Sequence, residues 1–474
     1  MEKYEGYIFT ALCSTNFLIS CLLFSKVTRE QRGPYMDEIF HVPQAQKYCS
    51  GKFNEWDPMI TTPPGLYLIS VGLIKPVAWL AGLTGAVVCS TAMLRFINLL
   101  FNSGNLYLLY LLVCKLHGRE KTRTTSRRVL SALSLSTFPA LYFFNFLYYT
   151  DAGSTFFVLF AYLMTLYGCH KASAFLAVCS VLFRQTNIVW VAFSAGTLAA
   201  AKMDDAWRAE HAKKRDEKSP PPQVPLSFSG AKKVTLFTLE FLASPGQVKA
   251  VLLVAWPYAA VGLGFVAFVL LNGGIVVGDR TSHEACFNAP QCFYFFCFAF
   301  FFSSPVSLCY RRALRFSQAV KRRPASVLLV ASVFLLLVWK FTFVHKYLLA
   351  DNRHFPFYVW QRVFQRHELA RFLLVPAYVF AGWNFMDSLK SRSLFWTLAF
   401  VACLLAATVP QKLLEFRYFV VPYLMYRLHV PLPSLPRLVG EFLLYTAVNA
   451  ATLYVFVSET FRWPESTAAQ RFMW

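Results

Sequence analysis

Two adjacent carboxylates, Asp37 and Glu38, follow the first long apolar stretch of this 474-residue chain, and His41 comes three residues later. Ionisable groups are costly to keep near hydrocarbon, so those beside a membrane span are frequently functional. One of these carboxylates could act as a general base, or both could form a solvated loop pair. Neighbouring helical residues point about 100° apart, so only one of the two can face a given acceptor atom. The same loop holds a second polar cluster with Trp56 and Asp57.

A basic group of candidate residues lies between positions 345 and 354. Lys346, Arg353 and His354 are suited to a lipid phosphate, because charge-assisted hydrogen bonds to phosphate favour Arg and Lys. Basic residues just outside a span also extend toward lipid headgroups without any catalytic role. Both interpretations stand on equal terms from these residues alone.

A glycine-rich stretch at 272–280 ends in Asp279 and Arg280. Its glycine content is that of a phosphate-binding loop, but the strand, the Gly-Lys pair and the helix of a nucleotide site are missing. A plain turn is therefore the simpler interpretation. His283 follows this stretch and could assist with sugar hydroxyls.

Two further polar stretches interrupt the apolar sequence. Arg184 lies in the stretch 183–187, and Arg417 lies in the stretch 411–418. Either stretch could line a cavity or satisfy the backbone of a broken helix. Arg417 could also form a purely structural ion pair with Glu415.

The elements that must position these residues are membrane helices. Hydrophobic residues make up 57% of the chain and charged residues only 15%, far from the balance of soluble domains. Many apolar runs approach the roughly 20 residues that a helix needs to cross a bilayer, and few alternate as barrel strands do. The formal charge of +22 does not indicate nucleic-acid binding, because the basic residues sit in short loops between spans. We expect an all-α polytopic membrane protein.

Basic loops divide the chain between two faces. Residues 115–128 hold six Lys or Arg against one acid, and residues 310–324 hold six with no acid. Loops of this kind face the cytosol. If residues 66–83 form an interfacial or re-entrant helix, every candidate site stretch falls on the opposite face. The segments expected to span number about 13: 7–24, 94–113, 129–147, 152–168, 172–183, 188–201, 250–271, 291–309, 325–344, 369–387, 394–409, 416–426 and 438–457.

Residues 1–474 are expected to form a single integral membrane domain with about 11–14 transmembrane helices. Its first loop on the non-cytosolic face, 25–93, is expected to hold interfacial or re-entrant helices. We expect a mobile cytosolic loop at 202–248 and two loops on the site face, 272–290 and 345–366.

The twelve cysteines lie mostly within apolar runs, without a CxxC pair or a Cys/His ligand spacing. No pair of carboxylates has DxD spacing, so the sequence suggests neither a metal nor another cofactor. Cys49 and Cys286 are both expected on the non-cytosolic face. A disulfide between them is possible, although spacing alone cannot show that their Cα atoms approach closely enough.

Six stretches, taken together, resemble the family of dolichyl-phosphate-glucose-dependent α-1,2-glucosyltransferases of the endoplasmic reticulum. The resemblance covers essentially the whole chain, and one departure is Pro63, where Leu would be expected. The stretches are 35–41, 56–62, 183–187, 272–275, 345–354 and 411–419.

The resemblance implies a GT-C-type bundle with a helical first lumenal loop and a lumenal active site in the endoplasmic reticulum membrane. The implied substrates are dolichyl-phosphate-glucose and a dolichyl-diphosphate oligosaccharide, which receives its terminal α-1,2-linked glucose for N-glycosylation. Asp37 is the implied base, with Glu38 as second choice. Phosphate is a weakly basic leaving group, so one carboxylate suffices and no general acid is needed. The side chains expected to bind substrate are His41, Trp56, Asp57, Arg184, Asp279, Arg280, His283, Lys346, Arg353, His354 and Arg417.

Two other classes of function remain open. A lipid or sugar transporter or flippase would place its charges near the bilayer midplane rather than at one membrane surface. A non-catalytic, channel-associated membrane protein would tolerate the loss of the acids on the site face.

Overall fold

The computed structural model describes residues 3–85, 88–118, 125–212, 228–280, 285–464 and 468–474. Its regular structure is helical apart from a short antiparallel ladder between β1 (Thr460–Phe461) and β2 (Gln470–Arg471). Together with its apolar helices, this makes the chain an all-α polytopic membrane protein.

Five of the described helices are long and apolar enough to cross a bilayer. They are α1 (Lys3–Glu30), α4 (Thr91–His117), α11 (Pro245–Asn272), α14 (Pro324–Phe341) and α21 (Leu435–Ser458). Four shorter apolar helices accompany them, and each has fewer residues than a full crossing requires. These are α3 (Gly65–Leu80), α7 (Asp151–Leu166), α8 (His170–Phe183) and α19 (Leu394–Thr408).

A straight span expected at 129–147 is instead a bent pair. The helix α5 (Thr125–Ser136) ends just before α6 (Pro139–Tyr142) and the 3-10 turn η2 (Phe143–Phe146), with a bend of 51° between the two parts. Proline disfavours helical geometry in the residue before it and cannot donate a backbone hydrogen bond, so the break falls before Pro139.

The remaining described helices connect and cover these elements. They are α2 (Glu38–Cys49), η3 (Gln185–Asn187), α9 (Ile188–Ala212), α10 (Phe228–Ala243), α12 (Pro290–Ser307), α13 (Tyr310–Arg322), α15 (Lys346–Ala350), α16 (Phe355–Val359), the π-helical turn η4 (Trp360–Phe364), α17 (Ala370–Leu373), α18 (Val375–Ser388), η5 (Phe416–Phe419) and α20 (Val420–His429).

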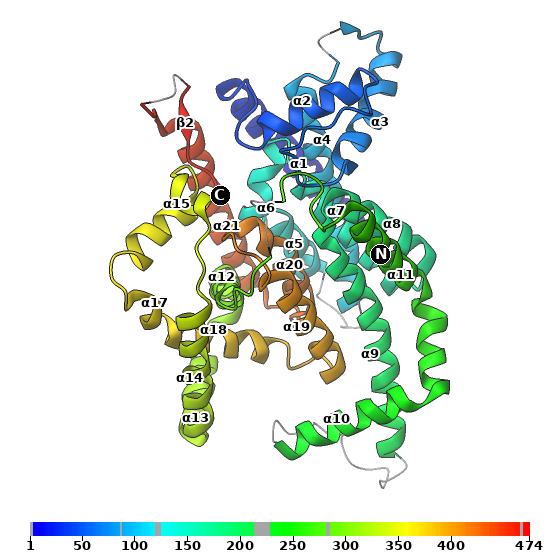
Figure 1. Ribbon diagram of the computed structural model, residues 1–474, viewed down its shortest axis with the longest axis vertical. Coiled ribbons are helices and arrows are strands. Elements are labelled where there is room, and N and C mark those ends of the chain that lie inside the picture. The colour runs from blue at the N-terminus through cyan, green and yellow to red at the C-terminus, as the bar shows by residue number, and fades with distance from the viewer. Residues whose placement is uncertain (1–2, 86–87, 119–124, 213–227, 281–284, 465–467) are drawn as a thin grey trace.

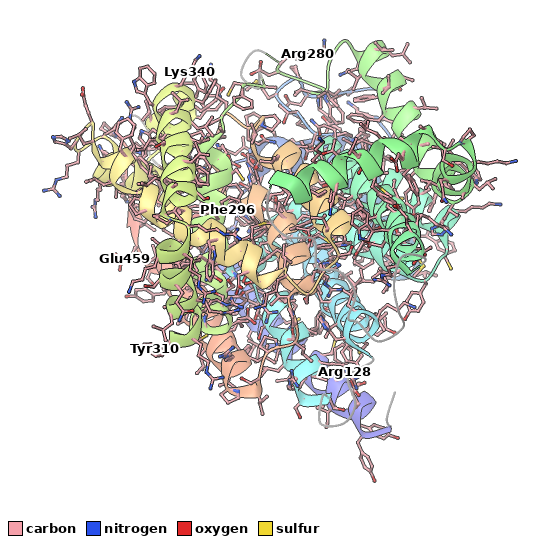
Figure 2. The ribbon with its side chains drawn as sticks, turned by 90° about the horizontal axis from the view of Figure 1, so that it is seen from below. Arg128, Arg280, Phe296, Tyr310, Lys340 and Glu459 are labelled. Atoms are coloured by element: carbon pink, nitrogen blue, oxygen red, sulfur yellow. A yellow bond between two sulfur atoms is a disulfide. The ribbon has the colours of Figure 1, made fainter. Side chains whose placement is uncertain are left out.

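The molecule has two distinct ends. Arg280 and Lys340 lie at one end, and Arg128 and Tyr310 lie at the other (Figure 2). Helices α2 and α3 lie together beside α4, and β2 lies beside α15 and α21 (Figure 1).

A stripe of asparagines on α4 fixes the segment that precedes α7. Asn98, Asn102 and Asn105 follow each other at helical spacing and are fully buried. The amide of Asn98 donates to the carbonyls of Leu147 and Tyr149 at 2.7 and 2.8 Å, and Asn105 donates to the carbonyl of residue 152 at 3.0 Å. Buried amides need such partners, so this stripe places the segment 145–152 against α4.

Most described residues of the loop expected at 202–248 are helical. Helix α9 continues to residue 212, and α10 begins at residue 228. Val234, Phe237 and Phe241 recur at helical spacing on α10 and are buried, with Phe237 packed edge-on against Trp207 of α9. This apolar stripe was the signal for a helix, and its burial packs α10 against α9.

The disulfide considered between Cys49 and Cys286 is wrong. Cys49, the last residue of α2, is bonded to Cys89 just before α4, with 6.6 Å between their Cα atoms. The return of the chain through α3 brings these two cysteines together. Cys286 is a free thiol whose backbone N–H donates to the carbonyl of Pro410 at 3.2 Å.

The disulfide closes a loop over a sequence separation of 40, which restricts the unfolded chain. We expect Cys49→Ser to lower the free energy of unfolding by about 4 kcal/mol, and Cys89→Ser to do the same. The double variant should be no less stable than either single one. Peptide mapping without reductant should recover a linked pair of peptides from these positions. A Cys49 peptide linked to Cys286, or equal destabilisation by Cys286→Ser, would contradict the pairing.

Candidate functional site

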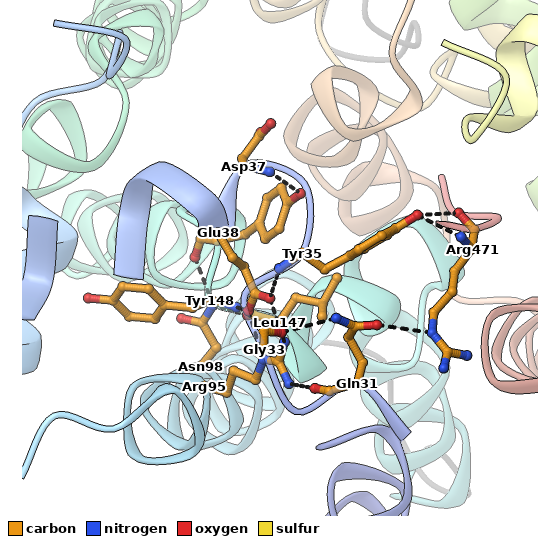
Figure 3. A network of polar contacts seen from close by, with 11 residues as sticks. Gln31, Gly33, Tyr35, Asp37, Glu38, Arg95, Asn98, Leu147, Tyr148 and Arg471 are labelled. Atoms are coloured by element: carbon orange, nitrogen blue, oxygen red, sulfur yellow. Dashed lines mark hydrogen bonds and ion pairs between the residues drawn. The ribbon is translucent and has the colours of Figure 1, made fainter. Parts of the chain in front are cut away.

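Glu38 forms a buried ion pair with Arg95 of α4, and both side chains are 0% exposed. Its two oxygens accept from Arg95 Nε at 2.8 Å and Nη2 at 2.5 Å. The backbone N–H groups of Tyr35 and Tyr148 donate to the same carboxylate at 2.9 and 2.6 Å (Figure 3). A carboxylate offers about four acceptor positions, so these donors occupy all of them. Glu38 is therefore built into the structure as an anchor for the loop.

Asp37 immediately precedes α2, and its side chain points away from the buried pair (Figure 3). Its Oδ2 accepts from Arg417 Nη1 at 2.9 Å, and 39% of the side chain is exposed. Its backbone N–H donates to the hydroxyl of Tyr149 at 3.1 Å. The preceding residue, Met36, has a φ of 55°, a left-handed conformation that is strained for a side chain of this size. The backbone is thus held so that one acid faces inward and its neighbour faces an accessible space.

The neighbouring charges keep Asp37 ionised. Partial desolvation acts to raise the pKa of Asp37, but the positive charge of Arg417 outweighs it, and the pKa lies below its ordinary value of 3.8. The same balance, burial against the charge of Arg417, lowers the pKa of Glu415. Arg417 Nε also bonds the carboxylate of Glu415. Both acids therefore carry a negative charge at neutral pH.

A second ion pair adjoins this one. Asp151, the first residue of α7, accepts from Arg184 Nη1 at 2.9 Å and is 3% exposed. Its other oxygen lies 4.0 Å from Arg417 Nη1, which joins the two pairs into one network. The guanidinium of Arg184 also lies over the ring of Tyr418, 5.3 Å from its centroid. Residues from four distant parts of the chain thus form one charged cluster.

His41 lies one turn into α2 and is buried. Its Nδ1 lies 2.5 Å from the hydroxyl of Tyr67 on α3. Desolvation lowers the pKa of His41 to about 4, although the charge of Asp37 opposes this shift. The imidazole is therefore neutral at pH 7 and can exchange hydrogen bonds with a hydroxyl without adding charge.

The glycine-rich loop packs against the second polar cluster of the first loop. The backbone N–H of Asp279 donates to the carbonyl of Pro58 at 2.9 Å. A Cβ on Gly278 would come within 2.3 Å of that same carbonyl, so only glycine permits the approach. Trp56 and Asp57 directly precede this contact. Trp56 Nε1 is buried and has no acceptor among the residues that the structure describes.

Arg280 and His283, two other residues of this region, were also expected to bind substrate. Arg280 donates to the backbone carbonyls of Asn272 and Val276, so it braces its own loop. His283 lies outside the described residues.

The basic cluster around 345–354 is partly neutralised. Arg353 Nη2 pairs with Asp351 at 2.7 Å, and its guanidinium lies over the ring of Trp463 at 4.5 Å. His354 Nδ1 lies 2.6 Å from the backbone oxygen of Trp474. Lys346 is exposed, with its ammonium over the ring of the next residue at 5.2 Å. Of these, His354 is electrostatically coupled to Asp37 and acts to lower its pKa.

An ion pair joins Asp37 directly to Arg417, and Asp151 links Arg184 to the same cluster. His354 is close enough to influence them, whereas Lys346 and Arg280 make no ion pair with this cluster among the described residues. Sequence reasoning missed Asp151 as a member. It stands at the start of the apolar helix α7, so an acid at the beginning of an apolar run was the available signal.

Among the described residues, no group of three or more His, Cys, Asp or Glu side chains could hold a metal ion. The carboxylates of the cluster are instead bound by guanidinium groups. The arrangement can hold one ionised, accessible carboxylate beside fixed positive charge, which suits proton removal next to an anionic leaving group.

A solved structure, an Archaeoglobus fulgidus oligosaccharyltransferase crystallised with zinc and sulfate, shows a weak likeness. Its TM-score is 0.29 at 12% identity, covering 88% of this chain and 54% of that one. A likeness this weak supports no argument about the fold or the site.

Comparison of the whole sequence is far more informative. A Mus musculus protein is 57% identical over 476 residues, with all of both chains covered. A Drosophila melanogaster protein is 33% identical with 93% of each chain covered, and an Arabidopsis thaliana protein is 32% identical with 93% and 95% covered. All three bear the name Dol-P-Glc:Glc(2)Man(9)GlcNAc(2)-PP-Dol alpha-1,2-glucosyltransferase. The model of the DIE2/ALG10 family matches residues 31–428, and the chain belongs to that family.

Proposed function

We propose that this protein transfers glucose from dolichyl-phosphate-glucose to the lipid-linked oligosaccharide Glc2Man9GlcNAc2-PP-dolichol, forming the terminal α-1,2-linked glucose. The names of its full-length relatives support the substrates. The observation that carries the chemistry is Asp37, an accessible carboxylate kept ionised by Arg417. The GT-C class remains an expectation from the resemblance.

The transfer is a single displacement with inversion. The 2-hydroxyl oxygen of the acceptor sugar attacks C1 of the donor glucose, and the bond from C1 to the phosphate oxygen breaks. The hydroxyl proton passes to Asp37, and the electron pair of the broken bond leaves with dolichyl phosphate. Attack opposite the phosphate converts a β-linked donor into an α-linked product. Because phosphate is a stable anion, the leaving group requires no proton.

Cationic groups beside Asp37 stabilise the charge that develops on the leaving phosphate. Arg417 already touches the base, and Arg353 and His354 lie on the segment next to it. Fixed donors of this kind act most strongly in a site that excludes water, where charge interactions are weakly screened. We assign the exposed side chain of Lys346 to the same role.

Neutral and aromatic groups complete the proposed substrate contacts. His41 can exchange hydrogen bonds with sugar hydroxyls, and Trp56 can donate one from Nε1. The ion pair of Arg184 and Asp151 shapes the adjoining wall. Asp57 and Asp279 flank the contact between the first loop and the glycine-rich loop, where an oligosaccharide could lie.

We infer that the site faces the lumen of the endoplasmic reticulum. The disulfide from Cys49 to Cys89 supports this orientation, because disulfides persist in oxidising compartments and the cytosol keeps thiols reduced. Two residues that border basic stretches, Arg128 and Tyr310, lie away from Arg280 in Figure 2, which supports the same orientation.

Replacing the two acids should separate catalysis from stability. Asp37→Asn should lower transfer by about a thousandfold or more and leave the thermal unfolding midpoint nearly unchanged, because it removes the base and one accessible ion pair. Glu38→Gln should instead lower stability by about 3 kcal/mol, because it leaves Arg95 buried without its partner. Purified protein with synthetic donor and acceptor lipids, and product measured by mass spectrometry, provides the assay. Full activity of Asp37→Asn would overturn the choice of base.

The pH dependence should follow the lowered pKa values. Asp37 is the working base in its carboxylate form, which is present above its pKa and lost as pH falls through it. That pKa lies below 3.8 and the pKa of His41 is about 4, so kcat/KM should show no acid limb from either group above about pH 5.

The matched variant is Arg417→Gln, which removes the charge that lowers the pKa of Asp37. Besides losing activity, this variant should show an acid limb displaced to higher pH in kcat/KM profiles. A wild-type limb near pH 6 that Asp37→Glu does not move would contradict the assignment.

A further inference from the structure

Residues 470–474 enter the region of the candidate site from the far end of the chain. Arg471 joins the ends of two long helices, donating to the carbonyl of Glu30 on α1 at 2.9 Å and to that of Phe456 on α21 at 2.7 Å. It also donates to the side chain of Gln31 at 3.1 Å. Each of these bonds uses a different part of one guanidinium group, whose planar fork suits several acceptors at once.

Arg471 is connected to the catalytic loop through Tyr35. The hydroxyl of Tyr35 accepts from the backbone N–H of Arg471 and donates to its carbonyl, both at 2.7 Å. The backbone N–H of Tyr35 in turn bonds Glu38 at 2.9 Å. Figure 3 shows this chain of contacts, with Arg471 at one end and the acids at the other. Tyr35 is buried and stands two residues before Asp37.

Residues 470–474 also form hydrogen bonds with the basic residues Arg353 and His354. Met473 is fully buried, and its backbone exchanges hydrogen bonds with Arg353 and Phe355 at 2.9 and 3.0 Å. Its neighbour Trp474 accepts from His354 through the backbone oxygen. Gln470 accepts from Arg353 Nη1 at 3.1 Å. The residues proposed to bind phosphate are therefore oriented by backbone and side-chain groups of this segment.

Aromatic packing fixes the segment in place. The ring of Trp474 contacts Phe302 of α12, Phe355 of α16 and Phe416 of η5, with centroids 5.6 to 6.3 Å apart. Phe416 is the residue between Glu415 and Arg417. Ring contacts of this geometry add to the burial of the indole and leave the segment little freedom.

We propose that residues 470–474 are a positioning element of the transfer site, acting on Asp37 through Tyr35 and on Arg353 and His354 directly. The inference rests on the proposed function. It assigns Tyr35, Arg471 and Gln470 no contact with substrate. A purely structural role would not separate kinetic constants. In the positioning role, loss of the Tyr35 contact should lower kcat, and loss of the Arg353 contact should raise the donor KM.

The catalytic end is tested with Tyr35→Phe, which removes only the hydroxyl that bonds Arg471. We expect kcat to fall about tenfold with the KM values of donor and acceptor unchanged, because the base is displaced while binding groups stay. The matched control is Tyr142→Phe, which deletes a buried hydroxyl bonded to Ser20 of α1 at 2.7 Å. The control should lose similar thermal stability and retain kcat.

The action on the residues proposed to bind phosphate is tested with Gln470→Ala, which removes the hydrogen bond from Arg353 Nη1. We expect the donor KM to rise about fivefold with the acceptor KM unchanged, as for the loss of one hydrogen bond that orients a binding group. The control is Gln318→Ala, an exposed position on the basic helix α13.

The outcomes separate this proposal from the proposed function. Wild-type protein that makes no glucosylated product overturns the proposed function itself. Wild-type transfer with Tyr35→Phe equal to Tyr142→Phe in kcat, or with an unchanged donor KM in Gln470→Ala, overturns the positioning role. If Tyr35→Phe fails to fold, Gln470→Ala decides alone.

Discussion

The buried pair of Glu38 and Arg95 is the interaction on which the rest of the site depends. Two fully desolvated charges are stable together only when hydrogen bonds satisfy both, and here two backbone N–H groups complete the carboxylate. This requirement fixes the loop before α2 against α4 and against residue 148. Asp37 is thereby turned outward, so one acid of the adjacent pair supplies rigidity and the other remains accessible.

The charged cluster around the proposed base Asp37 carries a net negative charge. Asp37, Asp151 and Glu415 contribute three negative charges, and Arg184 and Arg417 contribute two positive ones, which leaves one excess negative charge. The guanidinium groups keep the base ionised but are already paired. In the proposed reaction the neighbouring segment 345–354 adds further positive charge, because Lys346 and Arg353 outnumber Asp351 there.

Sequence reasoning found the helical membrane fold and the family, because both depend on local composition or on contiguous motifs. It could not separate Asp37 from Glu38, since their different roles depend on Arg95, 57 residues away. It also missed Asp151 and the partner of Cys49. Those contacts depend on how short helices fold back, which apolar periodicity does not record. The helix at 228–243 was detectable in principle, from the spacing of Val234, Phe237 and Phe241.

The long-range contacts of the Asp37 loop also constrain how the protein is made. Arg417 lies 380 residues after Asp37 in the chain, and Arg471 lies 436 residues after Tyr35. During synthesis, the loop with the proposed base Asp37 is made soon after the first membrane helix. Arg417 and Arg471 are made near the end of the chain. The loop therefore lacks its contacts with Arg417 and Arg471 while the intervening helices insert into the membrane. A chain stalled in the bilayer would carry the acid without the groups that position it, so activity itself reports complete assembly.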